Sequence, residues 1–350
     1  MSHREVICRA PVHEDRGDRS RLSATISMPD EDQEIWFEGP AAHLADRTAP
    51  DAFALAVLLP AMRVADHLVI EAPISPALRA NLEHLQDVES MWWPDRLRRV
   101  TIDAATLEPP PTRGSGTAAF FSGGVDSSYI VLTERERIDA LILIHGFDIA
   151  LDDTELRLAA SRHIGEAAAD LGLELVEVVS NLRDFSTAYA YWLDDYHGLA
   201  LACVGHALGA TFGHAFIASA ILRDRPGPHG LHPVLIPMFG SDRIDFSVPD
   251  EGVPRLDKIA VVSRSEIALR HLRVCWQTPG AYNCGTVRSA LGPRSGSSWR
   301  APRDRSTGSP PLTRMSLLRP SPVSPSPVEC TTWLKPTTSE QWPSEPTPTS

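Results

Sequence analysis

The sequence has little cysteine and no long apolar run, and each of these absences excludes a class of protein. Five cysteines in 350 residues, without paired spacing outside segment 275–284, exclude a disulfide framework. No apolar run approaches the ~20 residues that cross a bilayer, so we expect no membrane association. Residues 1–5 lead into no signal-peptide core, which makes the cytoplasm the expected location.

Basic residues are outnumbered in most of the chain. The formal net charge is −12, and residues 286–350 hold 8 Lys/Arg and 4 Asp/Glu, which leaves 25 and 41 in residues 1–285. Residues 1–285 therefore carry about −16 by the same formal counting. An acidic body repels polyanions, so we expect no nucleic-acid partner.

One short segment combines glycines, hydroxyl groups and a carboxylate at the end of an apolar run. Residues 117–121 predict a buried strand, and residues 127–136 predict a helix. The segment that joins them reads Phe121, Ser122, Gly123, Gly124, Val125, Asp126, Ser127 and Ser128. Glycines let backbone N–H groups converge on one oxyanion, and serines add hydroxyl donors at the helix N-terminus. This pattern favours a phosphate-binding loop over a turn that merely links strand to helix.

Asp126 is the charged residue of this loop. Polyphosphate repels a carboxylate unless a divalent cation lies between them, so Asp126 is predicted to bind Mg²⁺ directly or through water. The sequence has no Gly-Lys-Ser/Thr after the loop, which excludes a Walker A motif. The dinucleotide-binding pattern Gly-x-Gly-x-x-Gly is absent from the loop as well.

The run Ser-Gly-Gly-Val-Asp-Ser-Ser at 122–128 resembles the PP-loop of the ATP pyrophosphatase family, which includes asparagine synthetase, GMP synthetase, 7-cyano-7-deazaguanine synthase and tRNA-thiolating enzymes. The resemblance implies ATP and Mg²⁺ as cofactors and cleavage between the α and β phosphates. A substrate oxygen is then adenylated, and a nitrogen or sulfur nucleophile displaces AMP. The resemblance also implies that residues 121–128 bind the phosphates, and that His145, Gly146 and Phe147 lie beside adenine.

Three regions of different composition follow one another along the chain. Residues 1–110 mix strand-like and helix-like runs, which predicts a small α+β N-terminal domain or an N-terminal extension of the sheet. Residues 114–285 alternate strand and helix, which predicts a parallel α/β sheet, and the resemblance implies a Rossmann-like (HUP-type) fold. Residues 286–350 contain 12 of the 30 prolines and many Ser, Thr and Arg, so we expect a disordered tail.

Apolar periodicity places the individual elements. The first region is predicted to contain strands 34–37 and 67–70 and helices 52–64 and 75–85. After the helix at 127–136, the second region is predicted to contain strands 141–144, 173–179 and 215–220 and helices 152–171 and 194–209. Ligands of parallel sheets bind at the carboxyl ends of the strands, so loops 122–128 and 145–147 are expected at one edge.

Lys258 lies in a helical stretch that Arg255 opens, and it is one of very few lysines in the chain. The resembling enzymes use a basic residue of a late helix to neutralise charge on the α-phosphate as pyrophosphate leaves. Lys258 is therefore a candidate catalytic residue together with Asp126. The alternative is a surface lysine that pairs with Asp257 or Glu251.

Cys275 and Cys284 match the beginning of a four-cysteine zinc motif in relatives of 7-cyano-7-deazaguanine synthase. The other two cysteines are missing, and two thiolates do not close a tetrahedral Zn²⁺ site. Three explanations stay open: histidines such as His271 complete the site, zinc has been lost, or the reading frame shifts after Gly285. The third is favoured because the composition changes abruptly there, which would make residues 286–350 a frameshift product.

These observations together favour an ATP-dependent, AMP-forming ligase that joins carbon to nitrogen on a small carboxylate or amide acceptor. Sulfur transfer to a nucleotide or tRNA is one alternative, and a catalytically inactive ATP-binding protein is another. No cysteine follows Met1, so we expect no glutaminase domain of the asparagine-synthetase type, and ammonia from solution or an amidotransferase partner would supply the nitrogen. A homodimer is compatible with the sequence.

Overall fold

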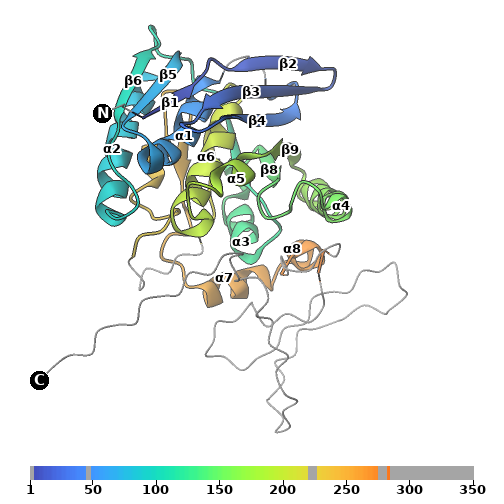
Figure 1. The fold of residues 1–350 in the computed structure, drawn as a ribbon. Helices are drawn as coiled ribbons and strands as arrows, with labels where there is room; N and C mark the ends of the chain where they lie inside the picture. The colour runs from blue at the N-terminus through green and yellow to red at the C-terminus, as the bar shows by residue number, and fades with distance from the viewer. Residues whose placement is uncertain (1–3, 45–48, 220–226, 275–281, 284–350) are drawn as a thin grey trace, which may run out of the picture. The chain divides into compact units, whose positions relative to one another are not determined.

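The computed structural model describes residues 4–44, 49–219, 227–274 and 282–283, which Figure 1 draws as a coloured ribbon. These residues all belong to one structural unit of the chain, Met1–Thr313. The predicted tail at 286–350 and the two cysteines Cys275 and Cys284 lie outside the described residues.

The fold is α/β and is built on one mixed sheet. Within the described residues this sheet has 11 strands in the order β11-β10-β7-β8-β9-β4-β3-β1-β5-β6, with β2 paired to β3. The strands are β1 (Glu5–Cys8), β2 (Val12–Arg16), β3 (Arg19–Ser27), β4 (Asp32–Pro40), β5 (His67–Ile74), β6 (Thr101–Thr106), β7 (Gly116–Phe120), β8 (Ala140–His145), β9 (Glu174–Ser180), β10 (Phe212–Phe216) and β11 (Asp245–Ser247).

The parallel arrangement expected for residues 114–285 is present in that part of the sheet, whereas the sheet as a whole is mixed. Strands β9, β8, β7, β10 and β11 are each parallel to their neighbours in this series. Strand β4 then pairs antiparallel with β9, where Phe37 lies opposite Ser180, and β3 is antiparallel to both β4 and β1. Residues 1–110 therefore extend the sheet of the second region, and the coil between β6 and β7 contains the expected boundary at 110–114.

Helices cover both faces of the parallel strands. Ala118 and Phe120 of β7 belong to the apolar core that also contains residues of α1 and α6, whereas Ala119 and Phe121 pack with residues of α3 and α4. This alternation follows from the two-residue period of a strand. The helices are α1 (Pro50–Val64), α2 (Pro76–Trp92), α3 (Val125–Thr133), α4 (Thr154–Leu171), α5 (Leu182–Ser186), α6 (His197–Ala207), α7 (Arg255–Val262) and α8 (Glu266–His271).

Local sequence signals explain where the longer helices begin and end. The side chain of Asp153 accepts a hydrogen bond from the backbone N–H of Leu156 at the start of α4, and Gly172 ends α4 in the left-handed conformation with φ 62°. The Ser75 hydroxyl caps α2 in the same way, by accepting from the Leu78 N–H. Among the described helices, none combines the length and the apolar character of a membrane span.

Several expected boundaries are shifted in the structure. The helix expected at 75–85 continues to Trp92, and the one expected at 194–209 begins at His197, after a π-helical turn at Trp192–Tyr196. The strand expected at 215–220 is Phe212–Phe216. The backbone N–H of Ser219, beyond the end of that strand, donates to the Asp250 carboxylate. A hydrogen bond to a side chain thus takes the place of backbone pairing with a neighbouring strand.

Candidate functional site

The Gly-rich loop leads from the parallel strand β7 into α3. β7 ends at Phe120 and α3 begins at Val125, two residues earlier than expected, because Gly124 occupies the capping position with φ −74° and ψ 169°. Glycine has no side chain to cap the helix, and no side-chain hydrogen bond from this position is present. The first N–H groups of α3 therefore receive no side-chain cap from Gly124. They form the positive end of the helix dipole, which attracts anions.

The serines of the loop lie around this helix start. The Ser127 hydroxyl donates to the Gly124 carbonyl at 3.2 Å, and the hydroxyl oxygens of Ser122 and Ser127 are 3.5 Å apart. Ser127 and Ser128 are buried, whereas Ser122 is partly exposed. Ser122 is therefore the hydroxyl of the loop most accessible to a ligand.

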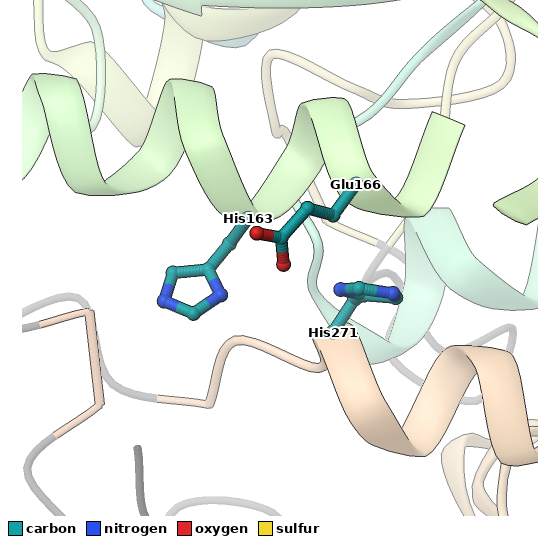
Figure 2. Close-up of side chains that lie close together, drawn as sticks. All are labelled: His163, Glu166 and His271. Carbon is teal, nitrogen blue, oxygen red and sulfur yellow. The ribbon is translucent and has the colours of Figure 1, made fainter. Parts of the chain in front are cut away.

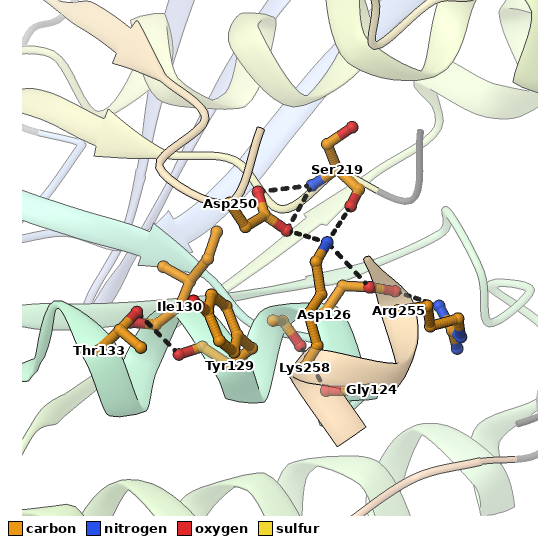
Figure 3. A network of polar contacts seen from close by, with 10 residues as sticks. Gly124, Asp126, Tyr129, Ile130, Thr133, Ser219, Asp250, Arg255 and Lys258 are labelled. Carbon is orange, nitrogen blue, oxygen red and sulfur yellow. Dashed lines mark hydrogen bonds and ion pairs between the residues drawn. The ribbon is translucent and has the colours of Figure 1, made fainter. Parts of the chain in front are cut away.

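Lys258 of α7 meets Asp126 at this helix start, and Figure 3 shows its amine among three oxygen partners. The amine Nζ donates to Asp126 Oδ1 at 3.2 Å, to Asp250 Oδ2 at 2.5 Å and to the Ser219 carbonyl at 2.6 Å. Its side chain is 2% exposed. The alternative of a surface lysine paired with Asp257 or Glu251 does not describe this buried side chain.

Arg255 supplies a second positive charge to the cluster. Its guanidinium Nη1 donates to Asp126 Oδ2 at 2.5 Å, and its side chain stays 39% exposed. Asp250 is buried, and this burial raises its pKa, while the hydrogen bond from Lys258 acts in the opposite direction. Two carboxylates thus face two fixed cations, so the four side chains are formally neutral as a group.

The topology of the sheet places this cluster where α/β proteins bind ligands. In the order β9-β8-β7-β10-β11, the chain moves outward in one direction from β7 to β9 and then in the other direction from β10 to β11. The switch point of such a sheet lies between β7 and β10, and ligands bind there at the carboxyl ends of the strands. Asp126 follows β7 and Ser219 follows β10, so Lys258 joins the two sides of this point.

A segment that follows α8 lies against the Gly-rich loop. The backbone N–H of Arg273 donates to the Gly123 carbonyl at 2.8 Å. The Tyr282 hydroxyl donates to the His271 carbonyl at 2.8 Å, and a Cβ at Gly123 would lie only 2.7 Å from that hydroxyl oxygen. Gly123 also has φ +74°, so both its conformation and its surroundings require glycine.

Replacing Gly123 by Ala is expected to lower the free energy of unfolding by about 1–2 kcal/mol, because an alanine is strained at positive φ and displaces Tyr282. Gly124→Ala is the matched control: φ is −74°, and the added Cβ would meet only the Ser122 hydroxyl, at 3.3 Å. Urea denaturation of both variants measures the difference. Equal midpoints for the two variants would contradict the structural role of Gly123.

The three residues predicted beside adenine lie at the end of β8, next to β7 in the sheet. His145 is 3% exposed, and its Nε2 lies 2.9 Å from Glu177 Oε2, a hydrogen bond that lowers the pKa of Glu177. The Gly146 N–H donates to the Ile149 carbonyl, and the Phe147 carbonyl accepts from Arg183. The Gly146 N–H and the Phe147 carbonyl thus have partners within the chain.

Comparisons with known proteins add no relative. No family model, no curated protein and no solved structure matches the chain. The residues of the site therefore carry the functional proposal. Of the residues predicted as catalytic, Asp126 and Lys258 are brought into contact, and the predicted thiolate pair Cys275 and Cys284 lies outside the described residues.

Asp250 is the member of the cluster that sequence reasoning missed. It lies in the coil before α7, one residue before Glu251, and no local pattern distinguishes these two acidic residues. Only its burial beneath Lys258, together with its bonds to the Ser219 N–H, sets Asp250 apart. A weak signal existed, since an acidic residue eight positions before an isolated lysine can lie across a turn from it.

Proposed function

We propose that the chain is an ATP-dependent ligase that adenylates a small carboxylate or amide acceptor, releases pyrophosphate and lets a nitrogen nucleophile displace AMP. The observation that carries this proposal is the contact of Lys258 with Asp126 at the Gly-capped start of α3. The strand order 3-2-1-4-5 of the parallel part supports a Rossmann-like (HUP-type) core with a PP-loop.

Each part of the site has a role in this reaction. The N–H groups at the start of α3 and the Ser122 hydroxyl would bind the leaving pyrophosphate, because their dipoles favour negative charge. Lys258 would stabilise the charge that develops as the bond between the α and β phosphates breaks, and burial strengthens this effect. The ion pairs with Asp126 and Asp250 keep the amine oriented before the nucleotide binds.

Asp126 has the donor chemistry that Mg²⁺ requires. Mg²⁺ is commonly bound by one or two carboxylates together with substrate phosphates, and Asp126 supplies one such carboxylate beside the proposed phosphate site. Arg255 donates a hydrogen bond to one carboxylate oxygen of Asp126, and the arginine side chain is partly exposed. The arginine can therefore turn toward a phosphate and leave that oxygen of Asp126 available. Bound Mg²⁺ would supply charge neutralisation of the phosphates.

The described cysteines do not favour the sulfur-transfer alternative. A sulfur carrier needs an accessible thiol with a low pKa. Cys8 and Cys203 are both buried, and burial raises the pKa of Cys8 to about 12 and that of Cys203 well above its ordinary value. Neither of these two thiols is accessible, and the other three cysteines lie outside the described residues. Nitrogen from ammonia or an amidotransferase partner remains the proposed nucleophile.

The proposal is tested by incubating the purified full-length chain with ATP, MgCl₂, an ammonium salt and a panel of small carboxylates and amides. We expect AMP and pyrophosphate in equal amounts. Asp126→Asn should reduce their formation by about 100-fold or more, since Mg²⁺ and Lys258 both lose a charged partner. Asp257→Asn, at an exposed position one residue before Lys258, is the control with unchanged turnover. ADP and orthophosphate as products would contradict the proposal, and nucleotide binding without product would favour an inactive ATP-binding protein.

A further inference from the structure

Three side chains of residue types that can ligate a metal converge at the contact between α4 and α8, and none of them belongs to the Lys258 cluster. His163 and Glu166 come from α4, and His271 is the last residue of α8; Figure 2 shows the three side chains facing one another. One ligand atom from each residue lies within 4.8 Å of the other two. The spacing of three residues between His163 and Glu166 places them on the same face of a helix.

The hydrogen bonds of His271 leave one ring nitrogen available. Its Nε2 lies 2.9 Å from Asp170 Oδ2, and a carboxylate only accepts, so Nε2 carries the proton. Nδ1 is buried and has no hydrogen-bond partner among the described residues, in a side chain that is 4% exposed. Figure 2 shows one ring nitrogen of His271 on the side of Glu166 and the other pointing away. A buried nitrogen lone pair without a partner is costly unless a ligand satisfies it.

We propose that His163, Glu166 and His271 bind one divalent transition-metal ion, with Zn²⁺ as the best match. Two imidazoles and a carboxylate suit Zn²⁺, whereas Mg²⁺ and Ca²⁺ prefer oxygen ligands alone. Asp170 completes the arrangement, because a carboxylate that accepts from the second nitrogen of a ligating histidine orients the ring and increases its basicity. Tetrahedral Zn²⁺ brings its ligand atoms to about 3.4 Å from one another, and the exposed Glu166 can move by the remaining distance.

The ion would hold α8 and the residues after it against α4. Tyr282 stacks on the His163 ring with centroids 4.4 Å apart and donates to the His271 carbonyl. Arg273, two residues after His271, donates its N–H to Gly123 of the Gly-rich loop. The metal is thus structural in this proposal, and it fixes the segment that contacts the loop. The site uses no thiolate, and it does not depend on the ligase activity.

The first experiment measures Zn²⁺ affinity of the metal-depleted full-length chain by competition with a chromogenic chelator. We expect one high-affinity Zn²⁺ per chain and a loss of about 100-fold or more in Glu166→Gln and His271→Ala. Asp170→Asn, which removes the orienting carboxylate together with its ion pair to Arg270, should lose about 10–100-fold. His84→Ala, at an exposed position of α2, is the histidine control, and circular dichroism verifies that each variant is folded. Glu166 is exposed, so its amide variant keeps the test valid if His271→Ala does not fold.

The second experiment separates this site from the two cysteines that sequence analysis singled out. A Cys275→Ser/Cys284→Ser variant should retain its Zn²⁺, and the Co²⁺-substituted chain should lack the thiolate-to-cobalt charge-transfer band in the near ultraviolet. Loss of Zn²⁺ in the double serine variant combined with normal binding in Glu166→Gln would overturn the proposal. Absence of a high-affinity Zn²⁺ in the unmodified chain would overturn it as well.

Discussion

Replacing Lys258 by Met is expected to reduce pyrophosphate formation by about 1,000-fold while ATP binding stays measurable. The amine is the fully buried cation of the site, and it reaches both the carboxylate of the Gly-rich loop and the strand end at Ser219. The methionine fills a similar volume but supplies no charge to the breaking bond. The measurement is the release of AMP and pyrophosphate at saturating ATP, together with nucleotide affinity.

The same substitution also leaves two carboxylates without their shared cation, so stability must be measured separately. Removing one partner of a buried ion pair typically costs about 3–5 kcal/mol, and Asp250 is buried. Lys258→Met/Asp250→Asn removes this uncompensated charge and should recover much of the stability without recovering turnover. Lys335→Met serves as the lysine control. Normal turnover in either Lys258 variant would remove this residue from the mechanism.

Glu89→Gln is expected to stabilise the protein at alkaline pH and to leave its stability nearly unchanged at about pH 5. Glu89 of α2 is 2% exposed, and burial, followed by the nearby Asp195 charge, raises its pKa to about 8. Asp195 is buried too and pairs with Arg96 at 3.2 Å. The region therefore holds two buried acidic groups with one arginine near both.

The direction of the pH effect follows from proton binding. The folded chain holds the Glu89 proton up to about pH 8, whereas the unfolded chain releases it near the ordinary pKa of 4.5. The free energy of unfolding therefore falls as pH rises from about 4.5 to about 8, by up to roughly 1.4 kcal/mol per pH unit. The glutamine variant lacks this loss and should be more stable than the unmodified chain by about 2 kcal/mol or more at pH 8.5.

Urea denaturation of both proteins between pH 5 and 9 measures this difference. Glu136→Gln is the matched control, because Glu136 is exposed and its replacement should leave the pH dependence unchanged. A constant difference between Glu89→Gln and the unmodified chain across this range would show that Glu89 is ionised in the folded state throughout.

The local sequence predicted the helix and strand content near the site well, because the relevant forces act over a few residues. The glycines at 123 and 124, the cap at Asp153 and the αL residue Gly172 are local requirements of the backbone. Short continuous apolar runs likewise predicted β7 and β8 to within a residue. Boundaries were less well predicted where long-range contacts replace local ones, as at Ser219.

Other features depend on contacts between residues far apart in the sequence. The ring of His271 gains its role from Asp170, 101 residues away, and no spacing in the chain signals this pair. Asp250 lies only eight residues before Lys258, but its hydrogen bonds to the Ser219 N–H, 31 residues away, set it apart from Glu251. The pairing of β4 with β9 is similar, since it joins residues 1–110 to the parallel strands through backbone hydrogen bonds that any sequence can form.

The sequence by itself determined that a Gly- and Ser-rich turn with one carboxylate follows a buried strand and begins a helix. That much depends on side-chain volume, backbone freedom and apolar period, all of which are local properties. The tertiary structure alone decided which charges meet this turn: Lys258 and Arg255 face Asp126, Asp250 lies beneath Lys258, and His271 meets α4. Burial and the order of the strands set these contacts, and both are properties of the folded chain as a whole.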